Sequence, residues 1–146
     1  MKLKKVASSE DLPFGERTTT YNSRLAQELG KWAEEEDRSD EFHQAMFRAY
    51  FADGKNIADE GVLLDVAASV SLDVVEAKRI LGDRVFKDAV DNDWQRAFDL
   101  GITAVPTFLI DIRRLVGAQT YEVLERFILS KDEHSSTSSN RKIFLT

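Results

Sequence analysis

Few side chains in this sequence could carry out chemistry on their own. The chain has 146 residues and no cysteine. That absence excludes thiolate nucleophiles, disulfide bonds, cysteine-ligated zinc and iron–sulfur clusters. The two histidines, His43 and His134, stand far apart in the sequence, and isolated histidines make neither a metal site nor a catalytic pair. We therefore expect no resident metal, no cofactor and no catalytic residue.

Two sets of carboxylates are the other candidates for metal or acid–base chemistry. The run from Glu34 to Asp37 ends a helical pattern, where carboxylates oppose the helix macrodipole. A metal or acid–base role is one interpretation of this run, and a solvated surface is the favoured one. Asp91 and Asp93 are two residues apart, and side chains with that spacing face apart on a helix, so we reject them as a ligand pair.

The stretch from Gly101 to Ile110 is the remaining candidate site. It lies between a long helical pattern and the only good strand candidates. Pro106 has no N–H group, so at the start of a strand it marks an edge or a special turn. From the residues alone, a trans proline that opens a strand is the simpler interpretation. A cis Val105–Pro106 bond is the alternative, and such a bond usually serves a site.

Length and charge exclude several classes of protein. A chain of this length predicts one domain with a core of its own. The net charge of −6 gives no positive field that would attract nucleic acid or anionic lipid. The basic start at Lys2, Lys4 and Lys5 is not followed by the apolar run of a signal peptide, and no stretch is apolar enough to span a membrane. We expect a cytoplasmic location, with neither a nucleic-acid nor a membrane partner.

The spacing of apolar residues predicts an α+β fold that is mostly helical. Residues 1–19 are expected to form a loop, and five helices should follow within residues 20–100. Asp59 and Asp73 are expected to cap the third and fourth helices, and Gly82 to end the fourth. The fifth, at about 83–100, has the clearest pattern. Its apolar side carries Phe86, Ala89, Val90, Trp94, Ala97 and Phe98.

The C-terminal part predicts two strands and one more helix. Residues 107–111 and 114–117 should be strands joined by a tight turn, and Thr120 should cap the helix. The apolar face of that helix would carry Tyr121, Leu124, Phe127 and Ile128. Residues 130–146 are polar and rich in serine, which predicts a disordered tail, although Ile143-Phe144-Leu145 could dock against another surface.

An ordered set of motifs resembles a known family. The closest match is Ala97-Phe98-Asp99-Leu100-Gly101-Ile102-Thr103-Ala104-Val105-Pro106-Thr107-Phe108, and Gly117-Ala118-Gln119 follows it. Further matches are residues 18–26, 46–51, 57, 62–64 and 121–124. Over residues 12–129 these motifs are similar to those of DsbA-type thioredoxin-fold oxidoreductases, and most of all to the FrnE-like branch. Glutathione-dependent chromenecarboxylate isomerases share the Val-Pro motif, but the Gly-Ala-Gln motif favours the FrnE-like branch.

This resemblance implies a partial thioredoxin-like fold with a substrate-facing loop. Residues 20–100 would be the DsbA-type helical insertion, and residues 101–129 the C-terminal β-hairpin and helix. In that family the Val-Pro bond is cis and lies beside a Cys-x-x-Cys pair, and the backbone before the proline pairs with an extended substrate. The residues facing a protein or peptide would then be Thr103, Ala104, Val105 and Pro106.

The departure from the family is large, because its first strands and its Cys-x-x-Cys helix do not occur in this sequence. Met1 begins within what resembles the linker into the helical insertion. Disulfide exchange requires a thiolate, so the chain alone is expected to be redox-inactive and to act at most in protein binding or self-association. Two alternatives stay open. The chain could be half of a split oxidoreductase whose Cys-x-x-Cys part another chain supplies, or it could be a helical interaction module.

Without those strands, one edge of the predicted strand at Thr107–Ile110 would be bare. A lone two-stranded hairpin is marginal in water, and an exposed apolar edge recruits another chain. We therefore expect a homodimer or larger assembly in which these strands meet. Ile112 stands where the family usually has glycine in the turn, and a β-branched residue resists positive φ. One long strand exchanged between chains is an alternative to an ordinary type I turn.

Overall fold

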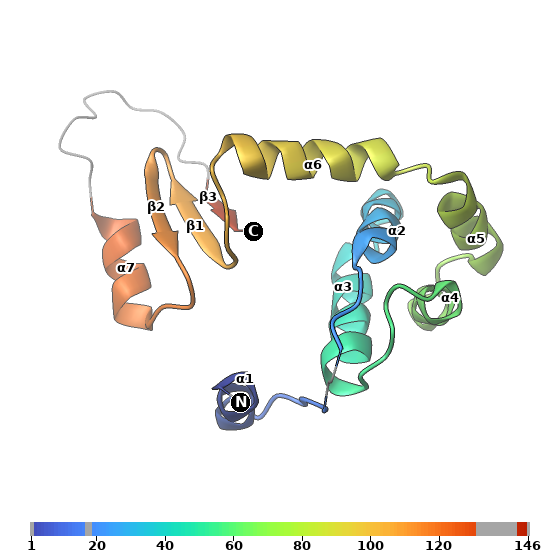
Figure 1. Cartoon of the computed structure of the whole chain (residues 1–146), viewed down its shortest axis with the longest axis horizontal. Helices are drawn as coiled ribbons and strands as arrows, with labels where there is room; N and C mark the ends of the chain where they lie inside the picture. Colours follow the sequence, from blue (N-terminus) through green and yellow to red (C-terminus); the bar gives the residue numbers. More distant parts are fainter. Residues whose placement is uncertain (1, 17–18, 131–142, 146) are drawn as a thin grey trace. The chain divides into compact units, whose positions relative to one another are not determined.

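The computed structural model of the chain describes residues 2–16, 19–130 and 143–145. It is mostly helical with one small sheet, as predicted (Figure 1). The chain divides into two compact units, Met1–Asp93 and Trp94–Thr146. The division lies within helix α6 (Lys87–Asp99) rather than at residue 100, where the sequence placed the end of the helical part. All members of the main buried cluster lie within residues 26–86. The later strands therefore do not contribute to this core, whereas the length of the chain predicted one domain with a single core.

The first unit consists of helices, and a side-chain hydrogen bond caps the start of two of them. Its elements are α1 (Lys2–Ser9), α2 (Arg24–Glu35), α3 (Ser39–Phe47), the π-helical turn η1 (Arg48–Ala52), α4 (Glu60–Ser69) and α5 (Val74–Asp83). The Asp59 carboxylate accepts a hydrogen bond from the backbone N–H of Val62 at 3.1 Å, and the Asp73 carboxylate accepts one from Glu76 at 2.9 Å. Both predicted caps are therefore confirmed. The loop expected over residues 1–19 is wrong for α1, where no glycine or proline interrupts the helix.

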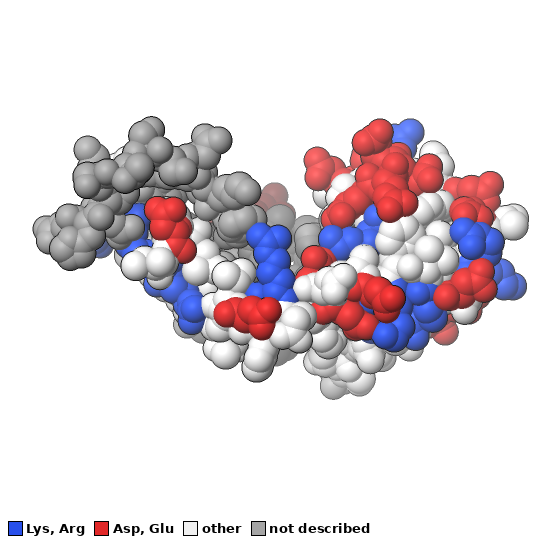
Figure 2. All heavy atoms as spheres, turned by 90° about the horizontal axis from the view of Figure 1, so that it is seen from above, with Lys and Arg blue, Asp and Glu red and all other residues white. Residues whose placement is uncertain are grey.

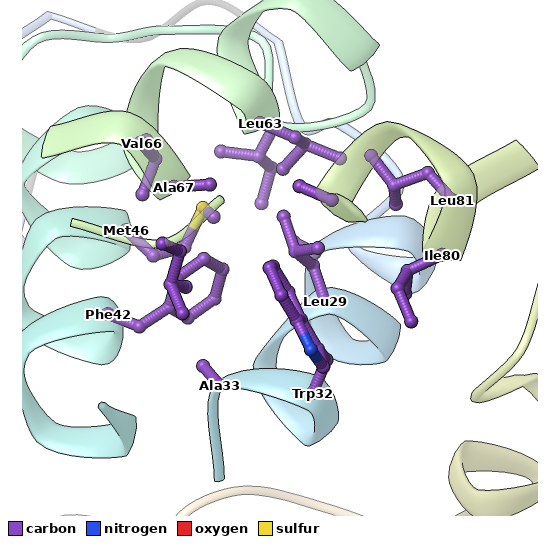
Figure 3. Close-up of a cluster of buried hydrophobic side chains, with 14 of the residues drawn as sticks. Leu29, Trp32, Ala33, Phe42, Met46, Leu63, Val66, Ala67, Ile80 and Leu81 are labelled. Atoms are coloured by element: carbon purple, nitrogen blue, oxygen red, sulfur yellow. The ribbon is translucent and has the colours of Figure 1, made fainter. Parts of the chain in front are cut away.

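The core of this unit lies between α2, α3, α4 and α5 (Figure 3). Leu29, Phe42 and Leu63 are almost completely buried at its centre. At Gly30, a Cβ atom would lie 3.5 Å from His43 Nε2 and 3.6 Å from Phe42 Cε1, so α3 crosses α2 at ordinary van der Waals distance. An alanine would fit at this crossing, so the contact does not require the glycine, which costs about 1 kcal/mol relative to alanine inside a helix.

Two expectations about these helices need correction. The α5 helix passes through Gly82 and ends at Arg84, which takes the left-handed conformation with φ +53. On the apolar side predicted for the fifth helix, Phe86 just before α6 and Val90 within it are buried, whereas Trp94 and Phe98 further along are 54% and 77% exposed. Burial of that side thus ends where the first unit ends.

The second unit contains an antiparallel sheet with strand order β2-β1-β3. Its elements are β1 (Thr107–Ile110), β2 (Arg113–Val116), α7 (Tyr121–Leu129) and β3 (Ile143–Leu145). The turn between β1 and β2 consists of Asp111 and Ile112, and Asp111 takes φ +54. Ile112 keeps negative φ and is 92% exposed. The hairpin closes within one chain, so one long strand through the turn is not formed.

The bare edge expected beside Thr107–Ile110 is occupied. The β3 strand pairs antiparallel with β1, with Leu109 opposite Phe144 and Ile110 opposite Ile143. The expectation of an unpaired β1 is therefore wrong, because β1 is the middle strand of three. The short apolar run at 143–145 forms this strand, and the remainder of the expected disordered tail beyond Ser130 lies outside the described residues.

Charged side chains of both signs lie next to one another on the face shown in Figure 2. In the first unit, Arg24 pairs with Asp91 at 2.6 Å and Lys31 with Asp93 at 2.8 Å. These two carboxylates therefore pair with different cations. Among the described residues, none of the helices has the length and apolar character needed to cross a membrane.

Candidate polypeptide-binding loop

The four residues singled out by sequence, Thr103 to Pro106, form an exposed loop between α6 and β1. All four side chains face solvent, and Val105 is 75% exposed. The Val105–Pro106 peptide bond is cis. Immediately after the loop, the chain becomes buried at Thr107, which is 1% exposed. An exposed apolar side chain, that of Val105, thus lies two residues before the first residue of the central strand.

Two hydrogen bonds hold the end of the loop that adjoins the sheet. The Thr107 hydroxyl donates to the carbonyl of Ala104 at 2.5 Å. The backbone N–H of Gly117, just after β2, donates to the carbonyl of Pro106 at 2.8 Å. Gly117 has φ +87, which favours glycine at this position. The carbonyls on either side of Val105 are therefore fixed by the hairpin.

The backbone of Val105 itself has free hydrogen-bonding groups. Within the part of the chain that the structure describes, neither its N–H nor its carbonyl makes a hydrogen bond. A backbone donor and acceptor that border a strand can pair with an extended chain, as in β-strand addition. The exposed side chain of Val105 itself can make apolar contact with the same ligand. This arrangement can bind a polypeptide, and it contains no nucleophile.

The start of the loop is held by Arg114, a residue that the sequence analysis did not single out. Its Nη1 donates to the carbonyl of Gly101 at 2.9 Å, and its Nη2 donates to the carbonyl of Leu100. Cations often bind the last carbonyls of a helix, which is the one signal available in the sequence. The partners lie 13 and 14 residues away, so the pairing depends on the hairpin and cannot be read from local spacing.

The other ionisable candidates do not converge on this loop. His43 lies on α3 with its Nδ1 3.2 Å from the Ser39 hydroxyl, and His134 lies outside the described residues. The buried Glu28 binds Arg24 and Arg84 within the first unit. The hydrogen bond from Arg84 lowers the pKa of Glu28 below its ordinary value, although burial opposes this effect. No group of three or more metal-binding side chains occurs among the residues described here.

Comparison with known proteins identifies the family. The model of the DSBA-like thioredoxin domain matches residues 1–129. The chain belongs to this family. The DsbA-like match extends to residue 1, beyond the limit of 12–129 inferred from motifs. The thioredoxin-like fold with a helical insertion is confirmed by it and by the structural similarity below.

Two relatives and one solved structure show what this chain is similar to. It is 33% identical over 105 residues to the uncharacterized protein YwbO of Bacillus subtilis (strain 168), which covers 71% of this chain and 52% of YwbO. It is 28% identical over 95 residues to the ClpXP adapter protein SpxH of the same organism, covering 60% of this chain and 32% of SpxH. The crystal structure of the probable DsbA oxidoreductase SCO1869 from Streptomyces coelicolor superposes with a TM-score of 0.79 at 29% identity. That match covers 87% of this chain and 56% of the oxidoreductase.

The DsbA-like chain therefore spans about half the length of YwbO and of the Streptomyces oxidoreductase. It spans about a third of SpxH. The match to the family model, over residues 1–129, includes the loop from Thr103 to Pro106 and the helices that precede it.

Proposed function

We propose that this chain is a redox-inactive DsbA-like protein of the FrnE-like branch that binds polypeptides. On its own it binds an extended polypeptide at Val105 and does not exchange disulfides. The observation that carries this proposal is the backbone of Val105, whose N–H and carbonyl make no hydrogen bond within the described chain. An extended ligand can pair with both groups and cover the exposed valine side chain.

The redox part of the proposal rests on the chemistry of exchange. A disulfide is exchanged when a thiolate attacks one of its sulfur atoms and a second thiolate leaves. The sequence contains no cysteine to form either thiolate. Binding without exchange is also in keeping with the name of one relative, the ClpXP adapter protein SpxH, which describes an adapter.

A second candidate is a split oxidoreductase, in which another chain supplies the Cys-x-x-Cys part. It is favoured by the extent of the similarity, because the match covers 56% of the probable DsbA oxidoreductase and leaves the rest of that protein unmatched. Co-purification with a cysteine-containing chain that restores disulfide reductase activity would support this candidate over binding alone.

Self-association also remains a proposal, as does a cytoplasmic location. The predicted route through the edge of Thr107–Ile110 now requires β3 to leave β1, because β3 occupies that edge. Size-exclusion chromatography with light scattering measures the oligomeric state.

A helical interaction module that does not use the loop is the remaining alternative, and it predicts binding that is insensitive to changes at Val105.

The experiment that tests the main proposal combines a binding assay with an activity assay. The binding probe is a fluorescently labelled polypeptide that is permanently unfolded by reduction and carboxymethylation. Val105→Pro removes the backbone N–H, whereas Val105→Ala keeps it and serves as the control. We expect Val105→Pro to abolish binding and Val105→Ala to weaken it only modestly. In an insulin-reduction assay with dithiothreitol, the wild-type chain should not exceed background; activity above background would contradict the proposal.

A further inference from the structure

We propose that Arg114 is a positioning residue of the loop, and that it sets where the free backbone groups of Val105 are presented. This inference rests on the proposed binding function of the loop. It concerns a residue on the hairpin that does not belong to the loop itself, and it follows from how the loop is anchored at each end.

The end of α6 makes carbonyl groups available to Arg114. The N–H of Gly101 donates to the Phe98 carbonyl at 2.8 Å, and the N–H of Ile102 donates to the Ala97 carbonyl at 2.9 Å. This pair of bonds is a Schellman motif, with Gly101 in the left-handed conformation at φ +63. It ends the helix and leaves the carbonyls of Leu100 and Gly101 without helical partners.

The Arg114 guanidinium binds both of these carbonyls. One nitrogen donates to Gly101 at 2.9 Å and the other donates to Leu100. Hydrogen bonds from a charged donor are stronger than neutral ones, and the rigid fork of arginine can serve two acceptors at once. A lysine at this position would supply a single flexible point of attachment.

Both ends of the loop are therefore attached to the same strand. Arg114 lies in β2 and holds the start of the loop, and Gly117 follows β2 and holds Pro106. Because β2 pairs with β1 in a fixed register, with Arg114 opposite Leu109, the hairpin fixes the distance between the two anchors. Val105 lies between the two anchors. Loss of one anchor should therefore make the backbone of Val105 more mobile while the sheet stays intact.

Gly101 provides an independent observation on the same contact. A Cβ atom at this residue would lie 3.1 Å from Arg114 Nη2 and 3.2 Å from Nη1. These distances are tighter than most Cβ contacts, so Gly101→Ala would push against the guanidinium as well as straining the backbone. The side chain of Arg114 is exposed, so its removal should leave global stability almost unchanged.

The test compares Arg114→Met and Arg114→Lys with wild type in stopped-flow binding of the labelled unfolded polypeptide. A loop that is only part of the time in its binding conformation lowers the association rate by that fraction. We expect about a fivefold slower association for Arg114→Met, partial recovery for Arg114→Lys, and an unchanged thermal midpoint. The control is Arg126→Met on α7, where the arginine donates within its own helix to the Glu122 carbonyl at 3.3 Å.

Two further measurements separate positioning from a general loss of structure. Backbone order parameters for residues 102–105 in the free chain should fall below about 0.6 in Arg114→Met and stay high in the control. Gly101→Ala should slow association in the wild-type background. When Arg114 is already methionine its effect should be smaller, and only the part due to backbone strain at Gly101 should persist.

The outcomes distinguish this inference from the function on which it rests. If wild type binds the polypeptide and Arg114→Met associates at the same rate, the inference is wrong and the binding function stands. If wild type does not bind at all, the proposed function fails and the positioning role fails with it. Slower association with loss of loop order in Arg114→Met, and neither change in Arg126→Met, supports both.

Discussion

Arg84 forms a bidentate ion pair with Glu28, to which it donates through Nε at 2.7 Å and Nη2 at 2.6 Å. The two residues are 56 positions apart in the sequence, and they join the end of α5 to the middle of α2. Glu28 is 1% exposed and also accepts a hydrogen bond from Arg24 at 2.7 Å. This contact explains why α5 ends at Arg84, in a left-handed conformation that non-glycine residues seldom adopt.

Substitution of Glu28 by glutamine should destabilise the first unit strongly. It removes the negative charge between two arginines and leaves hydrogen-bond donors poorly satisfied in a buried position. We expect a loss of about 3 kcal/mol in the free energy of unfolding, measured by urea denaturation at pH 7. Glu35→Gln is the matched control, because Glu35 lies on the exposed side of α2 and should change stability by less than about 0.5 kcal/mol. Equal effects of the two substitutions would contradict the role of this ion pair.

The same ion pair predicts how stability depends on pH. Hydrogen bonding to Arg84, and to a lesser degree Arg24, lowers the pKa of Glu28 below its ordinary value of 4.5. The unfolded chain therefore binds this proton more readily than the folded chain, so stability is gained as pH rises. The contribution should be complete above about pH 4.5 and be lost as pH falls through the lower pKa of the folded chain. Unfolding curves at pH 7 and below pH 4 should show the gap between wild type and Glu28→Gln narrowing in acid, and a constant gap would argue against this assignment.

Two glycines should respond to alanine in opposite directions. A Cβ atom at Gly15 would lie 2.2 Å from the carbonyl oxygen of Ala52 in η1, and the N–H of Gly15 donates to the Phe51 carbonyl at 2.8 Å. Gly15→Ala should therefore displace the backbone and cost about 1–3 kcal/mol. A Cβ atom at Gly82, inside α5, would meet no heavy atom within 4 Å beyond its own helix backbone, so Gly82→Ala should stabilise by about 1 kcal/mol. Thermal unfolding of the two variants measures both effects, and a stabilising Gly15→Ala would show that the loop does not pack on η1.

Removal of β3 should promote self-association. A chain that ends at residue 142 lacks the strand paired with β1, so the backbone groups along that edge of Thr107–Ile110 would be exposed. We expect light scattering at micromolar concentration to show a larger mean mass for this truncated chain than for the full chain. Deletion of Thr146 alone is the control, since it keeps the strand at Ile143–Leu145. If the truncated chain stays monomeric, the exposed edge of β1 does not cause self-association.

The features that were predicted correctly depend on residues close together in the sequence. Asp59 and Asp73 cap helices through bonds to residues three positions ahead, and Leu29 and Trp32 repeat on one face of α2. The Thr103–Pro106 loop was singled out through motifs, which carry information from a whole family, and its role as a binding site stays a prediction. Its exposure could be inferred in the same way, because the loop lies between a helix end and a strand.

The features that were missed depend on residues that meet only after folding. Gly82 was predicted to end α5, but the helix ends at Arg84, whose side chain binds Glu28 on α2. Arg114 reaches the end of α6 only because the hairpin folds back. The pairing of residues 143–145 with β1 was missed for the same reason, because a short apolar run does not indicate which strand it pairs with.

Binding at Val105 can be tested by amide hydrogen exchange, followed by NMR with and without the permanently unfolded polypeptide. We expect rapid exchange of the Val105 N–H in the free chain, because it has no hydrogen-bond partner among the described residues. We expect marked slowing when the polypeptide is added, because the ligand backbone then accepts the bond. Exchange at Val105 that is unchanged by a saturating amount of bound polypeptide would contradict the claim that this loop is the binding site.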